Sequence, residues 1–394
     1  MASKEEDGEL QYDGHLLFNE LCRTSEVENP NLTGVPRSIE GFLLDEILEV
    51  FEQGNSRDPG DGFERSQVRD YSTKLPEGTQ NFIDSLVALR YRDESYNTEE
   101  AEVEVGKRKK VKIPEETSVD VFWDSPDYLL IRGAEDEAED ARESIQSNFS
   151  GNASVKTVRL SFDFLLWLFY KHANEEPLSS KLETDRLANA EAKGSEDLLG
   201  KTSIVEDAPD VRDAPNFLLC LVHGKSVSML EGDFVIQTGP EDDEEESVRV
   251  EVQPEKIQIK ASKAGLRNSE KIEKMGFATQ VAHEILRIYD EWDNKDPADS
   301  DKIVPPDFIA EMLKRCHEQG VDIHNESTVL RVLKQQARRR DEDLEEYDLS
   351  DALGFLSEDE EEGGEEDAEE HETTEDEDGS GVADDEDSDE GVSA

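Results

Sequence analysis

The sequence has few cysteines, no long apolar run and too few basic residues to balance its acid, and each shortage excludes a class of protein. Cys22, Cys220 and Cys316 are odd in number and far apart, so they argue against a disulfide framework and favour a reducing interior. The most apolar run, Phe164–Tyr170, holds seven residues, far below the ~20 that a membrane-spanning helix needs. No apolar stretch follows Met1, so no signal peptide is expected. We therefore expect a cytoplasmic protein without membrane association.

The shortage of basic residues leaves a net charge of −58, from 100 acidic and 42 basic side chains. Part of this charge lies at the C-terminus, where Asp341–Ala394 holds 28 acidic residues and no Lys or Arg. The rest of the chain still carries −30, spread through every segment. This pattern is typical of a halophilic protein, because multimolar salt reduces the Debye length to ~3 Å and screens the repulsion. An ordinary acidic protein of a low-salt cell is the alternative.

No motif for catalysis, cofactor binding or metal binding is present. The seven histidines are scattered, and the Cys–His neighbours near Cys220 and Cys316 lack the second ligand pair of a structural zinc site. Gly200–Ser203 suggests a phosphate-binding loop, but five residues separate Gly194 from Gly200 where the motif needs four, and no apolar strand precedes them. The sequence therefore predicts no enzyme activity and no cofactor, and an unusual hydrolase or nuclease is the alternative.

The clearest fold pattern lies between Ser118 and Tyr170. Two apolar runs flank the turn Asp124–Asp127 and predict a β-hairpin, and apolar residues at steps of three or four predict a helix over Ala134–Phe149. Val158–Phe162 alternates apolar and polar residues as a strand does. Asp163 is expected to cap a helix that is buried nearly all round.

Further along the chain, short runs predict a series of antiparallel strands. They are expected at Phe217–Val222, Val227–Leu230, Phe234–Thr238, Val248–Val252 and Ile257–Ile259. Pro177–Lys193 is expected to be a polar helix or a linker. A helix over Ser269–Trp292 should dock on the sheet, with a break or kink at Gly276. The predicted fold class is α+β, with a mostly antiparallel central sheet and packed helices.

The N-terminal part is predicted as a helical module that ends in a basic hairpin. Helices are expected at His15–Cys22, Ile39–Gln53, Phe63–Tyr71 and Gly78–Leu89, followed by two strands within Glu102–Ile113. Helices followed by a two-stranded hairpin are the order of elements in a winged helix. A generic helical cap on the next domain fits the same order and is the favoured alternative.

The C-terminal part is predicted as two helices and an acidic tail. Phe308–Gln319 and Ser327–Arg340 are expected to form a helical hairpin, and a helix-turn-helix with a recognition helix is the alternative. Leu344–Leu356 alternates acidic and apolar residues, which suggests a contact with a protein partner. Residues 358–394 are expected to be disordered, because they hold no Phe, Trp or Tyr and no Lys or Arg. Solubilisation is the default explanation of this tail, and competition with nucleic acid for the protein's own basic residues is the alternative.

These patterns divide the chain into five predicted parts. They are a disordered N-terminus (1–13), the helical module with its basic hairpin (14–116), the central α+β domain (117–295), the helical hairpin (303–340) and the disordered acidic tail (341–394).

Three basic islands in this acidic chain are candidate contacts for nucleic-acid phosphate, which Lys and Arg side chains neutralise. The first lies in the predicted hairpin, the second precedes the helix at Ser269, and the third covers the polar side of the last helix. Their residues are Lys107, Arg108, Lys109, Lys110 and Lys112; Lys256, Lys260 and Lys263; and Arg331, Lys334, Arg338, Arg339 and Arg340. The alternative is solvent-facing charge that nearby acid neutralises, or, at the end of the last helix, charge that complements the helix dipole.

Two hypotheses follow from the sequence. The first is a non-enzymatic nucleic-acid-associated protein, a regulator or accessory factor that contacts DNA or RNA, from a halophilic cell or its virus or plasmid. The second is a protein-interaction subunit of a larger assembly, which uses Leu344–Leu356 and has no nucleic-acid contact. Under the first hypothesis the basic islands should converge on one face of the molecule, whereas under the second they can scatter.

Overall fold

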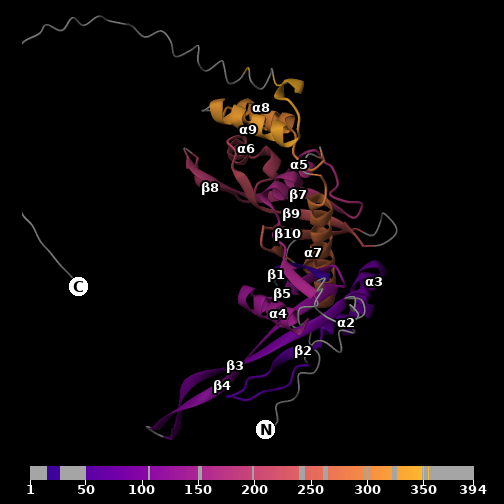
Figure 1. The fold of residues 1–394 in the computed structure, drawn as a ribbon, viewed down its shortest axis with the longest axis vertical. Coiled ribbons are helices and arrows are strands. Elements are labelled where there is room, and N and C mark those ends of the chain that lie inside the picture. Colours follow the sequence, from indigo (N-terminus) through magenta and orange to yellow (C-terminus); the bar gives the residue numbers. More distant parts are fainter. Residues whose placement is uncertain are drawn as a thin grey trace, which may run out of the picture.

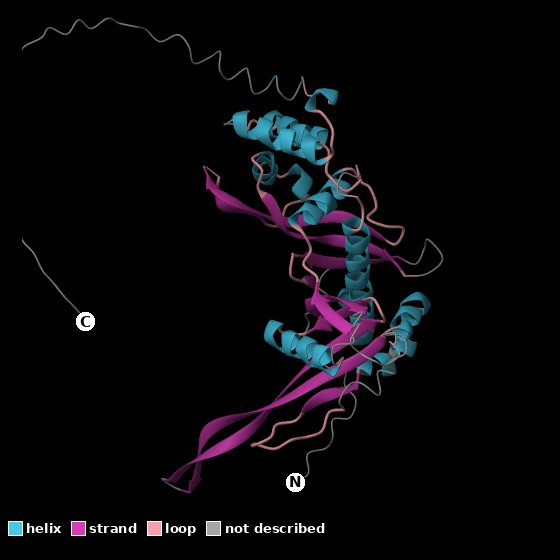
Figure 2. Ribbon diagram, viewed as in Figure 1, coloured by secondary structure: helices cyan, strands magenta, loops and turns pink. Residues whose placement is uncertain are grey.

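The protein is α+β, with helices packed on one large antiparallel sheet (Figures 1 and 2). The computed structural model describes residues 16–26, 50–104, 107–149, 153–197, 199–238, 245–260, 265–296, 299, 301–321, 326–347, 349 and 354. Within these ranges, no helix has both the length and the apolar character needed to cross a membrane. The predicted fold class is confirmed at this level.

The described strands form an 11-stranded sheet in which every strand pair is antiparallel. The order is β2 (Asp61–Arg65), β3 (Val87–Glu104), β4 (Lys107–Asp124), β5 (Tyr128–Arg132), β1 (Leu16–Glu26), β11 (Ile257–Ile259), β10 (Glu245–Val252), β9 (Ser226–Gln237), β7 (Leu182–Asp197) and β8 (Gly200–Val205). A further strand, β6 (Ala153–Thr157), pairs with β1. The first described strand therefore joins the two halves of the sheet.

The helices cover both faces of the sheet. They are α2 (Gln67–Asp70), α3 (Glu77–Ser85), α4 (Glu135–Asn148), α5 (Phe162–Ala173), α6 (Pro215–Val222), α7 (Lys271–Asp293), α8 (Pro306–Glu318) and α9 (Glu326–Arg339). On β4 the side chains alternate between two core clusters: Val121 and Trp123 pack with α4, whereas Phe122 packs in the larger cluster that includes α3, α5, α6 and α7. This alternation is what a strand buried on both faces requires.

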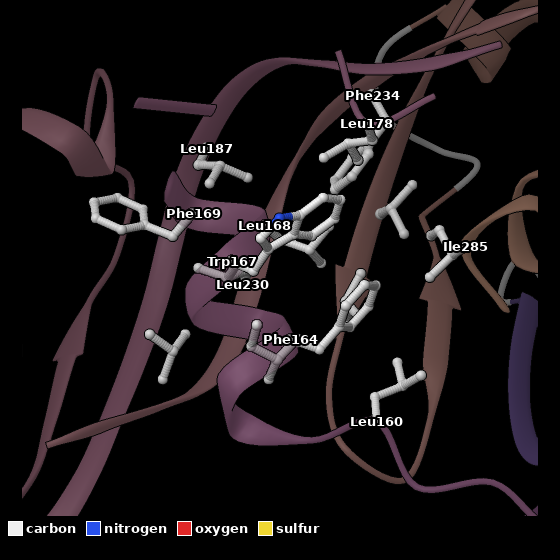
Figure 3. Packing of buried hydrophobic residues seen from close by; sticks show 14 of the residues in the cluster. Leu160, Phe164, Trp167, Leu168, Phe169, Leu178, Leu187, Leu230, Phe234 and Ile285 are labelled. Atoms are coloured by element: carbon white, nitrogen blue, oxygen red, sulfur yellow. The ribbon is translucent and has the colours of Figure 1, made fainter. Parts of the chain in front are cut away.

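Helix α5 lies at the centre of the larger cluster (Figure 3). Its Phe164, Trp167 and Leu168 side chains pack among Leu230 and Phe234 of β9 and residues of α7. The predicted buried helix is confirmed, but its N-cap is Ser161, whose Oγ accepts a hydrogen bond from Phe164 N at 3.1 Å. Asp163 is not the cap.

Three predictions for the first half of the chain are wrong. Leu16–Glu26 is a strand, not a helix, because its apolar residues pair into the middle of the sheet between β5 and β11. The helix expected at Phe63–Tyr71 is present only in part, because Asp61–Arg65 is a strand at the end of the sheet order and only Gln67–Asp70 is helical, as α2. The strand expected at Val158–Phe162 lies earlier, at Ala153–Thr157. The winged-helix module is therefore not confirmed. Of its expected helices, Ile39–Gln53 lies mostly outside the described residues, and Gly78–Leu89 is helical only as far as Ser85, in α3, since Val87–Leu89 belong to β3.

Four predictions for the second half also differ from the structure. Pro215–Val222 is a helix, not a strand, and all six residues Phe217–Val222 are buried, so no alternation could identify it. Leu182–Asp197 is a long strand, not a polar helix or linker. Its buried side chains are mostly alanines between polar residues, a weak signal in the sequence. The separate strands expected at Val227–Leu230 and Phe234–Thr238 are one strand, β9.

Helix α7 runs without a break through Gly276, contrary to the prediction. A Cβ at this position would lie 2.9 Å from Cδ2 of Leu75 and 3.1 Å from Cγ2 of Thr79. Glycine is therefore present because the segment that carries α3 approaches α7 closely there, and not because the helix kinks.

Two features lie at opposite ends of this elongated molecule (Figure 1). At one end the two long strands β3 and β4 project from the body as a twisted ribbon (Figure 2), which we call the arm. At the other end α8 and α9 pack beside α6 and each other. The residues between α8 and α9, 322–325, lie outside the described ranges, so the predicted helical hairpin is not confirmed, although both of its helices are present.

Candidate functional site

The first basic island lies on β4 in the distal part of the arm, opposite acidic residues of β3. The exposed side chains of Lys109, Lys110 and Lys112 belong to this island, and Lys112 Nζ donates a hydrogen bond to the Ser56 carbonyl oxygen at 2.6 Å. The backbone register sets Glu100 against Lys110, Glu102 against Arg108, and Glu104 against Lys107. Glu100 and Lys110 carry opposite charges directly across an antiparallel pair and attract each other, so part of this island is balanced within the arm.

The second island does not form an open positive face in the described residues. Lys260 Nζ lies 2.8 Å from Glu251 Oε2 and also contacts Glu231, which accepts a hydrogen bond from Arg249 Nε at 2.9 Å. Burial alone would raise the pKa of Glu231, but hydrogen bonds from Lys260, Arg249 and Asn189 outweigh burial and lower it to about 2. Lys260 is therefore part of a charge network on the sheet. Lys256 is half-buried beside β11, and Lys263 lies outside the described residues.

In the third island, two of the five residues bind other segments of the fold. Arg339 Nη1 donates to Asp163 Oδ1 at 3.0 Å, and so joins α9 to the start of α5. Arg340 Nη1 donates to the Ile303 carbonyl oxygen at 2.6 Å, and its Nε pairs with Glu342. These arginines have partners within the fold, which leaves them little capacity for a ligand.

The remaining three residues of this island, Arg331, Lys334 and Arg338, form what we call the α9 ridge. All three are exposed, and their spacing of three and four residues places them on one face of the helix. Throughout the described ranges, no carboxylate forms an ion pair with any of the three. They line a hollow of about 620 Å³ with Ser327, Leu330, Gln335 and Arg339. The ridge is thus an exposed set of cations without described partners in a strongly acidic chain.

A second hollow, of about 530 Å³, lies on the other side of Lys334 and Arg338. Its walls include Asp341, Glu342 and Asp343, the first acidic residues after α9. Beyond them, the predicted partner segment Leu344–Leu356 starts against the body: Leu344 and Tyr347 pack on the core, and Leu349 is only 5% exposed. Leu353, Phe355 and Leu356 lie outside the described residues.

Two His–Asp pairs come closest to a catalytic arrangement. His172 is 2% exposed, with Nδ1 3.1 Å from Thr184 Oγ1 and Nε2 3.0 Å from Asp210 Oδ1. Burial would raise the pKa of Asp210, but the hydrogen bonds from His172 and the Arg212 backbone lower it. This buried network borders neither of the two hollows beside the α9 ridge nor the third hollow described below, so we assign it a structural role.

The second pair borders a hollow of about 490 Å³ between α3, α7 and the end of β9. His283 Nε2 lies 2.8 Å from Asp124 Oδ2, and its ring packs between Phe82 and Tyr128. Within the described ranges, no group of three or more His, Cys, Asp or Glu side chains is arranged to hold a metal ion.

All three cysteines are buried. Burial raises the pKa of the Cys22 thiol far above its ordinary value and that of Cys316 to about 11. A thiol that stays protonated at neutral pH is a poor nucleophile, so we assign Cys22 and Cys316 to the core.

The islands do not converge. The arm and the α9 ridge lie at opposite ends of the molecule (Figure 1), and Lys260 lies between them on the sheet. Sequence reasoning identified the ridge residues but did not separate them from Arg339, whose partner Asp163 was assigned to a helix cap. Only the path of the chain in space brings these two residues together.

No protein-family model matches the chain, and no curated protein matches it at a significant level. The functional argument therefore depends on the geometry of the described residues.

Proposed function

We propose that this is a non-enzymatic nucleic-acid-associated protein, a regulator or accessory factor of a halophilic cell or of its virus or plasmid, that contacts DNA or RNA through the α9 ridge. The observation that carries the proposal is the exposure of Arg331, Lys334 and Arg338 on one face without carboxylate partners in the described ranges. In a chain of net charge −58, most exposed cations would be expected to pair with acid.

The length of the ridge suits a phosphate backbone. A helix rises ~1.5 Å per residue, so Arg331 and Arg338 are about 10 Å apart along the axis. One strand of a duplex presents about three phosphates over that length, at ~3.4 Å each. Three flexible cations of this spacing favour contact with the backbone over reading of base edges. We therefore expect binding that depends strongly on salt and weakly on sequence.

We assign the nucleic-acid contact to the α9 ridge alone and not to all three basic islands. The arm carries glutamates in register with its basic residues, and Lys260 is paired with two glutamates. Phosphate would have to compete with these carboxylates for the same cations. The ridge offers cations that no described carboxylate already holds.

The test is binding to labelled single- and double-stranded DNA and RNA by fluorescence anisotropy over a series of KCl concentrations, with folding checked by circular dichroism. The variant R331Q/K334Q/R338Q should bind more weakly to every sequence. The slope of log affinity against log salt should fall by about two to three for duplex DNA, because each lost phosphate contact removes ~0.9.

The matched control removes three exposed charges from the arm: K109Q/K110Q/K112Q. This variant should keep the affinity and the salt slope of the unaltered chain. Equal losses in both variants would show that the arm is also a phosphate contact, as the sequence suggested. Absence of binding by the folded, unaltered chain at every salt concentration would refute the proposal.

The second candidate is the protein-interaction subunit, and two observations favour it. The basic islands scatter over the molecule, and the arm exposes Val111 and Ile113 on one face, at 39% and 42%. Cross-strand neighbours Glu99 and Asn97 share that face. Absence of nucleic-acid binding in the experiment above would make this candidate the leading one.

A further inference from the structure

The two hollows beside the α9 ridge differ in charge. The hollow that holds the whole ridge has no acidic residue among its described walls, whereas the one beyond Lys334 and Arg338 is bordered by Asp341, Glu342 and Asp343. The chain therefore leaves α9 alongside the ridge and becomes acidic at that point. Residues 358–394, which we call the tail, continue this trend with 21 acidic residues and no Lys or Arg.

We propose that the α9 ridge is a docking surface for the tail of the same chain. A run of carboxylates offers the ridge the same chemistry as a phosphate backbone, which is a series of closely spaced anionic oxygens. The role of this contact as a competitor of nucleic acid rests on the function proposed above; the contact itself does not.

The tail can reach the ridge. Leu349 is buried against the body, so the chain is anchored close to the end of α9. Glu358 is nine residues beyond Leu349, which allows a span of up to about 30 Å when extended. Because tail and ridge belong to one chain, the local concentration of the tail is set by this tether and lies on the order of millimolar. Weak ion pairs are enough to populate such a contact.

The charge of the tail is opposite to that of the ridge and much larger. The tail carries 21 acidic residues against three ridge cations, so many of its segments can exchange on the ridge without a fixed register. Such a contact is electrostatic and weakens with salt, since the Debye length shortens from ~10 Å at 0.1 M to ~3 Å at 1 M. At low salt the tail therefore covers the ridge, and at high salt the ridge is open.

The first test is zero-length carbodiimide coupling in the full chain, followed by peptide mapping. Lys334 should form amide bonds with carboxylates of the tail, and the exposed Lys314 of the adjacent helix α8 is the internal control. The coupling of Lys334 should exceed that of Lys314 several-fold at the lowest salt at which the chain is folded. It should fall as KCl increases and in the variant R331Q/R338Q, in which Lys334 is retained.

Two outcomes would overturn the proposal. One is coupling of Lys334 no greater than that of Lys314, or unaffected by R331Q/R338Q. The other is coupling that rises with protein concentration, which would show that the tail of a second copy occupies the ridge. Neither outcome depends on nucleic acid, so this experiment decides on the docked tail even where the proposed function fails.

The second test measures competition in a full-length variant with every Glu and Asp of residues 358–390 changed to Gln or Asn. This variant should bind DNA at least about tenfold more tightly than the unaltered chain at low salt. The difference should disappear in R331Q/K334Q/R338Q. Equal affinities of the unaltered and neutralised chains would contradict a competing tail, whereas failure of both chains to bind would refute the proposed function alone.

Discussion

At the scale of single residues, charge inside this protein is organised in rows across the sheet. Arg90, Asp120 and Arg132 stand opposite one another on three neighbouring strands, and Asp120, 1% exposed, lies 3.2 Å from Arg90 Nε and 2.7 Å from Arg132 Nη2. Glu231 is also held by two cations, Arg249 and Lys260, although its direct neighbours across the strand pairs are Glu251 and Asn189. A buried carboxylate that is held in this way stabilises the fold only while it is ionised.

This argument gives a pH-dependent prediction for Glu231. The pKa of its carboxyl is about 2 in the folded chain and 4.5 in the reference state. The stabilisation is present above the unfolded pKa and is lost as pH falls from about 4.5 towards 2, and it amounts to at most about 3 kcal/mol. The free energy of unfolding from urea titrations should therefore decrease over this window.

The variant Glu231→Gln isolates that contribution. It should be less stable than the unaltered chain at pH 7 and should show a shallower pH dependence between about 4.5 and 2. The control is Glu116→Gln, because Glu116 pairs with Arg92 at an exposed site on the arm and should cost less than about 1 kcal/mol. Identical pH profiles for Glu231→Gln and the unaltered chain would contradict the assignment.

At the scale of elements, the arm is distinct from the rest of the sheet. Near its base, β3 and β4 carry buried residues such as Tyr91 and Val119, whereas Val111 and Ile113 further out are exposed. The distal parts of the two strands are therefore held by the backbone hydrogen bonds between them and by cross-strand charge pairs. They contribute little to either core cluster.

Shortening the arm should therefore leave the body intact. We expect that replacing Tyr96–Pro114 by Asn-Gly, a sequence that favours a tight hairpin turn between Ser95 and Glu115, changes the midpoint of thermal unfolding by less than about 4 °C. Circular dichroism measures the midpoint, and the control is an Asp120→Asn variant, which disrupts the buried row at the arm's base and should unfold much earlier. A large loss of stability on shortening would show that the distal arm packs on the body.

The elements that the sequence could predict are those with one clear periodicity. Helix α4 and the hairpin of β4 and β5 were predicted correctly, since their apolar residues repeat at helical or strand spacing beside a turn. Helix α6 was mistaken for a strand because it is buried on all sides, although Pro215 at its first turn was a signal for a helix. Strand β1 was missed because its apolar residues are grouped around a bulge.

The candidate site could be predicted only in part. The basic islands are visible in the sequence, but their neutralisation is not, because it depends on the register that places Glu100 against Lys110 and on the fold that brings Glu231 to Lys260. The sequence composition alone identifies a run of cations. Whether those cations remain available to a ligand depends on contacts between segments that are distant in the sequence.

At the scale of the whole molecule, the dominant quantity is the net charge of −58. Even without Asp341–Ala394 the chain carries −30, so the folded body repels itself at low ionic strength. Added salt screens this repulsion, and the ion pairs of buried residues are screened much less. Stability should therefore increase with salt.

We accordingly expect the midpoint of thermal unfolding to rise steadily when KCl is raised from 0.1 M to above 2 M, followed by circular dichroism. The variant with a neutralised tail is the control, and it should show nearly the same rise, because the repulsion resides in the body. A midpoint that stays constant or decreases above 0.5 M would identify an ordinary acidic protein and remove the halophilic part of the proposal.

The burial of all three thiols has a practical consequence for these measurements. Maleimide dyes react with exposed thiolates, and the native cysteines are covered by protein in the folded state. A single cysteine introduced at Lys110 on the arm, or at Ser380 in the tail, would consequently be the preferred attachment point for a fluorophore. Fluorescence from a dye at either position could then be followed without first removing the native cysteines from the core.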